Sequence, residues 1–147
     1  MKLGWDEYFL DIAEMASKRA TCPVKQIGAV FVDRETHSIL SLGYNGSPRK
    51  TIHCGQACRD RKIGENSESC LAVHAEMNAI FNAALNGIQL KNSGAYLTLS
   101  PCFKCSQALV QVGVRKVVWK EEYPNKPYRN LFSQAGIWFY GIDWPVI

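Results

Sequence analysis

Two short motifs constrain the fold of this chain more than any other feature: His74-Ala75-Glu76 and Pro101-Cys102-Phe103-Lys104-Cys105. Each motif stands where an amphipathic helix is predicted to begin, so one imidazole and two thiols can meet at a single metal ion. Zinc that is held by three such ligands and keeps its fourth position open is typical of catalytic sites. The chain is therefore expected to bring the starts of two helices side by side.

Each residue type suits its predicted role for a physical reason. Cys102 and Cys105 form a Cys-x-x-Cys pair in the first turn of a helix, where both sulfurs point toward one ion and the helix dipole favours the thiolate form. Glu76 stands two positions after His74, and residues two apart on a helix do not share a face. We therefore expect Glu76 to contact a zinc-activated water, whose pKa falls to about 7, and to move its proton.

Length and composition favour one domain, which we expect to cover residues 1–147. The 147 residues are 47% hydrophobic and 20% charged, which is enough to bury a sizeable core. The net charge of +4 comes from scattered basic residues, which argues against a nucleic-acid partner and suits a small anionic substrate. Because no apolar run could span a bilayer and no export signal is visible, we expect a cytoplasmic protein, in the host cytoplasm if it is viral.

The periodicity of the apolar residues predicts a helix, a hairpin and then alternating helices and strands. Helices are expected over 5–19, 73–86, 101–113 and 130–135, and strands over 27–32, 38–43, 95–100, 114–119 and 137–140. This order predicts a three-layer α/β/α domain whose mixed sheet has about five strands. The predicted buried stripe of the first helix is Trp5, Tyr8, Phe9, Ile12, Ala13 and Ala16. That of the second helix is Val73, Met77, Ile80, Phe81, Ala84 and Leu85.

The two motifs resemble those of the zinc-dependent nucleobase deaminases. The segment Gly43-Tyr44-Asn45-Gly46-Ser47-Pro48, after Cys22-Pro23-Val24-Lys25-Gln26-Ile27-Gly28-Ala29-Val30, further resembles the deoxycytidylate (dCMP) deaminases of phages and bacteria. The resemblance implies a cytidine-deaminase-like fold and an enzyme that converts dCMP to dUMP and ammonia, which feeds thymidylate synthesis. It also implies that His74, Cys102 and Cys105 bind zinc and that Glu76 carries the proton.

The resemblance also implies contacts with substrate and effectors. Asn45 would contact the sugar, and the other candidate substrate residues are Lys25, Tyr123 and Lys126. From the composition of the polar loop 121–129, Tyr123, Lys126, Tyr128 and Arg129 are able to meet a phosphate, although Lys and Arg in a surface loop are usually just solvated. Activation by dCTP and inhibition by dTTP, with Mg²⁺ on the triphosphate, would involve Gly43, Tyr44, Asn45 and Gly46. We expect a homo-oligomer, with a hexamer favoured, and an aromatic cluster that is either core or subunit interface: Trp138, Phe139, Tyr140 and Trp144.

Four cysteines remain outside the catalytic set. A second, structural zinc would use Cys22, Cys54, Cys58 and Cys70, or His53 in place of one of them. Such an ion would tie the long segment 49–69 to the start of the first strand. The alternative is that these are reduced thiols, several of them packed, because Cys-x3-Cys is a looser signal than Cys-x-x-Cys.

Two other functions fit the same motifs. The first is deamination of an adenosine or cytidine in RNA, because the motifs do not name the base, although the scattered charge and the Tyr44-Asn45-Gly46 loop argue against it. The second is a non-enzymatic interaction module in which all six cysteines are structural. Four protein ligands on every zinc would support that module, and water in the coordination sphere would reject it.

Overall fold

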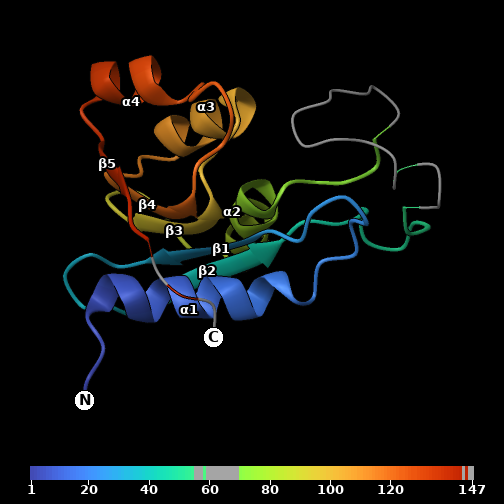
Figure 1. Ribbon diagram of the computed structural model, residues 1–147, viewed down its shortest axis with the longest axis horizontal. Helices are drawn as coiled ribbons and strands as arrows, with labels where there is room; N and C mark the ends of the chain where they lie inside the picture. The colour runs from blue at the N-terminus through green and yellow to red at the C-terminus, as the bar shows by residue number, and fades with distance from the viewer. Residues whose placement is uncertain (55–57, 59–69, 144, 146–147) are drawn as a thin grey trace.

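The computed structural model, which describes residues 1–54, 58, 70–143 and 145, has three layers (Figure 1). One face of the sheet is covered by α1 (Trp5–Ser17), and the other by α2 (Ala75–Leu85), α3 (Phe103–Gln111) and α4 (Arg129–Ala135). The strands are β1 (Gly28–Val32), β2 (Ile39–Tyr44), β3 (Gly94–Leu99), β4 (Lys116–Glu121) and β5 (Trp138–Gly141). The predicted α/β/α fold with a mixed five-stranded sheet is confirmed. The extent of the domain over 1–147 stays a prediction.

The order of the strands determines which loops can meet. The sheet runs β2-β1-β3-β4-β5, with β1 antiparallel to both of its neighbours and β3, β4 and β5 parallel to one another. The start of β1 therefore lies at the same end of the sheet as the carboxyl ends of β3 and β4. Ligand sites of open α/β sheets form at the carboxyl ends of parallel strands.

Alternate residues of β1 belong to two separate cores, because successive side chains of a strand point to opposite faces. Val30 and Val32 pack with Phe9 and Leu10 of α1 on one face. On the other face, the core includes Ala29, Phe31, Ala75, Ala79, Leu109, Tyr128 and Phe132. All five residues of β1 are buried, as is typical of a strand at the centre of a three-layer domain.

Two glycines let the helices approach the sheet closely. A Cβ on Gly28 would lie 1.9 Å from the carbonyl oxygen of Ala13 in α1. A Cβ on Gly43 would lie 2.6 Å from the carbonyl oxygen of Ala75 and 2.5 Å from the nitrogen of Ala79 in α2. Gly43 therefore fixes how deeply the first turn of α2 sits on β2.

The predicted buried stripes of the first two helices are partly wrong. In α1, Phe9 and Ala13 are buried as predicted, but Trp5 and Tyr8 are 50% and 43% exposed, and Leu10 and Ser17 are buried instead. In α2, the buried residues are Ala75, Glu76, Ala79 and Ala83. Because α2 lies so close to β2, small side chains fill the interface, while Phe81 and Leu85 are 45% and 70% exposed.

Some predicted boundaries also differ from the structure. The second helix begins at Ala75 and not at residue 73, because Val73 forms an isolated antiparallel bridge with Gly46. The second strand runs one residue further than predicted, because Tyr44 is the last residue of β2. Among the aromatic residues near the carboxyl end, Phe139 packs against the core that includes Phe132. Trp144 lies outside the described residues.

A carboxylate in the first turn of α1 ties this helix to three strands. Asp6 accepts hydrogen bonds from the hydroxyl of Tyr96 at 2.8 Å, from the ammonium of Lys116 at 2.9 Å and from the hydroxyl of Tyr140. These partners lie in β3, β4 and β5. Asp6 thus links the α1 layer to the half of the sheet that is parallel.

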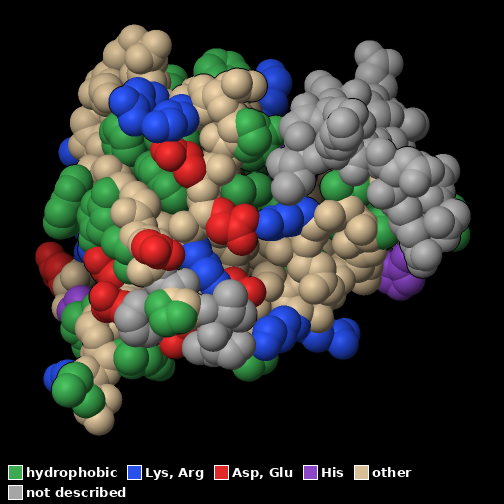
Figure 2. Space-filling model, viewed as in Figure 1, with side chains coloured by type: hydrophobic (Ala, Val, Ile, Leu, Met, Phe, Trp, Pro, Cys, Tyr) green, Lys and Arg blue, Asp and Glu red, His purple; other side chains and the backbone are tan. Residues whose placement is uncertain are grey.

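Figure 2 shows Lys and Arg side chains interspersed with Asp and Glu side chains over the face in view. Of the helices in the described part of the chain, none has the length and apolar character needed to cross a bilayer.

Candidate active site

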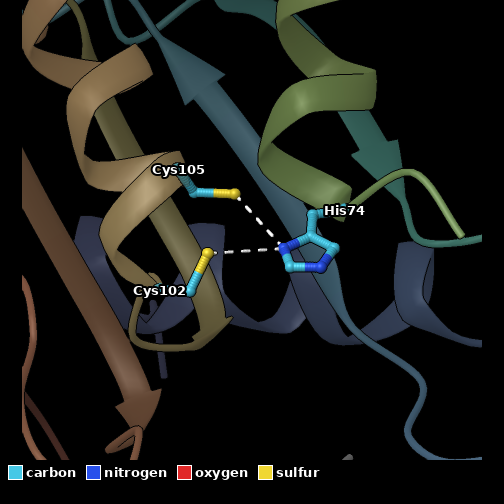
Figure 3. Close-up of side chains that lie close together, drawn as sticks. All are labelled: His74, Cys102 and Cys105. Atoms are coloured by element: carbon cyan, nitrogen blue, oxygen red, sulfur yellow. Dashed lines mark hydrogen bonds between the residues drawn. The ribbon is translucent and has the colours of Figure 1, made fainter. Parts of the chain in front are cut away.

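The starts of α2 and α3 bring the three predicted metal ligands together. His74 is the N-cap residue of α2, Cys102 is the N-cap residue of α3, and Cys105 lies in the first turn of α3. Figure 3 shows the three side chains pointing toward one another from these helix starts. The Nδ1 atom of His74 lies 3.5 Å from the Sγ of Cys102 and 3.4 Å from the Sγ of Cys105.

These distances fit a zinc ion. Zinc binds sulfur at about 2.3 Å and nitrogen at about 2.0–2.1 Å, so a tetrahedral ion separates a nitrogen ligand from a sulfur ligand by about 3.5 Å. Within the described ranges, His74, Cys102 and Cys105 are the only group of three or more potential ligands whose atoms all lie within 4.8 Å of one another. The donor set leaves the fourth position of a tetrahedron for a non-protein ligand. The structure therefore brings the three predicted ligands together, and their role in a catalytic zinc site stays a prediction.

Glu76 lies beside this group and is almost completely buried. It is the second residue of α2, it is 4% exposed, and it lines the same cavity as the three ligands. Burial raises the pKa of the Glu76 carboxyl above its ordinary value, although the nearby His74 acts in the opposite direction. A buried carboxyl group with a raised pKa can accept and return a proton near neutral pH.

Without a metal ion, the two thiols and the imidazole share protons unequally. The hydrogen bond with Cys105, followed by that with His74, lowers the pKa of Cys102 to about 4. The same contact and burial raise the pKa of the Cys105 thiol. The hydrogen bond with Cys102 raises the pKa of His74 to about 9. The metal-free site is thus a Cys102 thiolate beside a protonated imidazole and a neutral thiol.

A cavity of about 670 Å³ opens next to the ligands. This volume is in the usual range for small-molecule sites, which is about 300–1,000 Å³. Three predicted substrate residues line it, namely Lys25, Asn45 and Tyr123. Lys126 is not among the described lining residues, and its ammonium pairs with Glu122 at 3.4 Å.

Asn45 fixes one wall of the cavity through its side-chain amide. Its Oδ1 accepts a hydrogen bond from the backbone nitrogen of Ile27 at 2.8 Å, and its Nδ2 donates one to the carbonyl oxygen of Lys25 at 2.8 Å. Asn45 is 5% exposed, so this clamp is shielded from water. The segment that carries Lys25 is therefore held rigidly beside the cavity.

The sequence interpretation missed several lining residues. Ser100, Phe103 and Lys104 all line the cavity. Their position between or just before the zinc-binding cysteines was the available signal. Glu121, which contacts Lys25, gave no such signal because 96 positions separate the two residues.

The predicted effector residues lie at the end of β2 and just after it. Gly43 packs under α2, the carbonyl oxygen of Tyr44 accepts a hydrogen bond from Asn78, and Gly46 pairs with Val73. Of the four, Asn45 is the one that the described cavity lining includes. Effector binding by these residues stays a prediction.

All six cysteines line this one cavity. Cys22, Cys54, Cys58 and Cys70 therefore lie near the catalytic group, and none of them forms a disulfide bond. In the part of the chain that the structure describes, they do not form a group with ligand atoms within 4.8 Å of one another. The second zinc stays a prediction, and most of the segment that it was expected to tie down lies outside the described residues.

Together, the fold and the site define a zinc-dependent hydrolase centre, built where two helix starts meet at the carboxyl ends of parallel strands. The zinc-binding region of cytidine and deoxycytidylate deaminases matches residues 3–121. The chain belongs to this deaminase family. The resemblance in the motifs is thereby confirmed, and with it the cytidine-deaminase-like fold.

Individual relatives agree with this family. ComE operon protein 2 of Bacillus subtilis is 33% identical over 92% of this chain and 70% of its own length. The deoxycytidylate deaminase of Schizosaccharomyces pombe is 32% identical over 91% of this chain, which spans only 42% of that protein. The dCMP deaminase of the cyanophage S-TIM5, solved with dCMP and dUMP, is 29% identical over 97% of this chain and 99% of its own, with a TM-score of 0.81.

Proposed function

We propose that the protein hydrolyses dCMP to dUMP and ammonia. The observation that carries this proposal is that the group of His74, Cys102 and Cys105 and the buried Glu76 line one cavity of about 670 Å³. The likeness to the cyanophage dCMP deaminase supports the choice of substrate. The product would feed thymidylate synthesis, and the reaction on a free nucleotide would take place in the cytoplasm.

Zinc, when bound, would supply a water of lowered pKa that attacks C4 of the cytosine ring. Glu76 takes a proton from this water and delivers it to N3 of the base. Glu76 then moves the second proton to the departing amine. One water is consumed, the bond from C4 to the amine breaks, and ammonia leaves.

The rest of the nucleotide would lie along the other walls of the cavity. The side-chain amide of Asn45 has two donors and two acceptor lone pairs, and its contacts with Ile27 and Lys25 use one of each. The remaining donor and lone pair are proposed to contact the sugar. Lys25 and Tyr123 line the same cavity and are proposed to meet the phosphate. Lys126 would require a movement of its loop to join them, since it pairs with Glu122.

Regulation and assembly form the finer part of the proposal. We propose that dCTP activates and dTTP inhibits, with Mg²⁺ on the triphosphate and with Gly43, Tyr44, Asn45 and Gly46 at the effector site. We also propose a homo-oligomer, with a hexamer favoured. Leu85, a large apolar side chain that α2 exposes, is available for a contact between copies. The second structural zinc on Cys22, Cys54, Cys58 and Cys70 remains part of this proposal.

Ammonia release tests the proposed reaction. The zinc-loaded full chain is assayed with dCMP, dCTP, cytidine, adenosine and a stem-loop RNA, with and without dCTP and dTTP as effectors. We expect dCMP to have the highest kcat/KM and dUMP to be its product. Faster release from adenosine or from the RNA would contradict the choice of substrate.

A further inference from the structure

An ion pair joins the segment before β1 to the end of β4, beside the cavity. The ammonium of Lys25 donates a hydrogen bond to Oε2 of Glu121 at 2.6 Å. Lys25 precedes β1, Glu121 is the last residue of β4, and β3 lies between these strands. Glu121 is also in register with Leu99 and accepts a backbone hydrogen bond from Ser100, and both of these residues line the cavity. The ion pair therefore lies next to the end of β3, from which the chain continues to Cys102.

Lys25 is well placed to bind an anion inside this cavity. Its backbone is held by Asn45, and its side chain is 29% exposed, so the ammonium lies between the cavity and solvent. An ammonium group has three hydrogen-bond donors, and Glu121 takes one of them. The remaining donors are free to reach a phosphate. Among the described lining residues, the other Lys or Arg is Lys104, which is exposed.

A phosphate that the Lys25 ammonium attracts would be repelled by the carboxylate of Glu121. Its side chain is 54% exposed, so the carboxylate stands at the solvent edge of the pair and not inside the cavity. A monophosphate ester carries a charge of about −1.5 to −2 near pH 7, and each further phosphate group adds negative charge. A terminal phosphate on Lys25 would gain from the ammonium, whereas a second phosphate group that reached the Glu121 carboxylate would be repelled.

We propose that Glu121 is a specificity-determining residue that limits the number of phosphate groups on the substrate. Its carboxylate holds the Lys25 ammonium for one phosphate group and repels a second, so a nucleoside monophosphate is selected over a diphosphate. This inference rests on the proposed function, because it assumes that the cavity takes a deoxycytidine nucleotide.

The Glu121→Gln variant tests the inference, since a carboxamide keeps the size of the side chain and removes its charge. The zinc-loaded full chain is assayed with deoxycytidine, dCMP and dCDP. The diphosphate is used because the triphosphate is the proposed effector. We expect the ratio of kcat/KM for dCDP to that for dCMP to rise about tenfold through a lower KM for dCDP, and kcat/KM for deoxycytidine to stay unchanged.

A matched control and a binding measurement separate this role from a structural one. Glu122→Gln removes the neighbouring carboxylate, which contacts Tyr128 and Lys126, and should leave the ratio as in the wild type. Calorimetric titration with dUMP and dUDP, which undergo no turnover, should show the same shift in relative Kd for Glu121→Gln. Lys25→Gln should weaken the binding of both nucleotides.

Failure of the inference about Glu121 and failure of the proposed function give different results. The inference fails if the wild type deaminates dCMP but the dCDP-to-dCMP ratio changes less than about twofold in Glu121→Gln, or changes equally in Glu122→Gln. It also fails if Lys25→Gln binds dUMP as tightly as the wild type does. A zinc-loaded wild type that releases no ammonia from dCMP would overturn the proposed function itself, and the inference with it.

Discussion

At the scale of single residues, Glu76 combines burial with a position beside the metal ligands, and its neutral isostere tests its role. In Glu76→Gln, zinc should still bind stoichiometrically, because His74, Cys102 and Cys105 are unchanged. The rate of ammonia release should fall about 10²- to 10⁴-fold, since the amide cannot carry a proton. Zinc content and kcat are measured on the same sample, with Glu122→Gln as the control. Wild-type kcat in a zinc-loaded Glu76→Gln protein would rule out the proposed proton transfer.

The ligand pKa values predict proton release on zinc binding. At pH 7, His74 with a pKa of about 9 holds a proton, Cys105 with its raised pKa holds another, and Cys102 with a pKa of about 4 holds none. Zinc must displace both protons, so we expect release of about two protons per ion at pH 7, and zinc affinity that rises with pH. As the pH rises through 9, His74 loses its proton in the metal-free protein, so the number of protons released on zinc binding should fall by about one. Calorimetry in buffers with different ionisation enthalpies measures this number, and a value of zero would contradict the predicted protonation states.

At the scale of elements, the sequence predicted the helix starts to within two residues, but it predicted the buried helix faces only in part. The metal motifs are local, because Pro101 and the Cys-x-x-Cys pair mark the same helix start. The buried face of α2 depends on Gly43, which is far away in the chain and admits only small side chains such as Ala75 and Ala79. The contact between Lys25 and Glu121 could not be predicted from the sequence either, because it depends on the order of the strands in the sheet and not on the spacing of the residues in the chain.

Gly43→Ala tests this coupling between strand and helix. The new Cβ would meet backbone atoms of Ala75 and Ala79 within 2.6 Å, so α2 must move away from β2. We expect the free energy of unfolding to fall by about 1–3 kcal/mol. Zinc affinity should fall as well, because His74 is the N-cap of α2.

Chemical denaturation and zinc titration measure the two effects of Gly43→Ala. Gly94→Ala in β3 is the matched control, because its Cβ would meet other atoms at 3.6 Å or more. Equal effects of the two substitutions would show that close packing under α2 has no special influence on the metal site.

At the scale of the whole molecule, the three layers are held together by the two cores and by Asp6. Asp6→Asn leaves Lys116 without its carboxylate partner and weakens the hydrogen bonds from Tyr96 and Tyr140. Hydrogen bonds to charged groups contribute about 1.5–3 kcal/mol each, so we expect a loss of stability of about 2 kcal/mol or more. Thermal unfolding measures this loss, with Glu35→Gln in an exposed turn as the control. An unchanged Tm would show that the Asp6 carboxylate makes no measurable contribution to anchoring α1.

Asp6 also predicts how stability depends on pH. Burial alone would raise the pKa of Asp6, but the hydrogen bonds from Tyr140, Lys116 and Tyr96 outweigh it and lower the pKa below its ordinary value. The contribution of Asp6 is therefore present above its unfolded pKa of about 3.9 and is lost as the pH falls through its lower folded pKa. Unfolding curves of the wild type and of Asp6→Asn should converge in this acidic range. A constant difference in stability between them at all pH values would contradict this assignment.

The central claim is that three protein ligands hold zinc and leave its fourth position open beside a carboxylate. A crystal structure of the zinc-loaded full chain tests this claim most directly. We predict zinc bound by Nδ1 of His74 and by the sulfurs of Cys102 and Cys105, with a non-protein fourth ligand within hydrogen-bonding distance of the Glu76 carboxylate. A fourth protein ligand on this ion, or a Glu76 side chain directed away from it, would contradict the account.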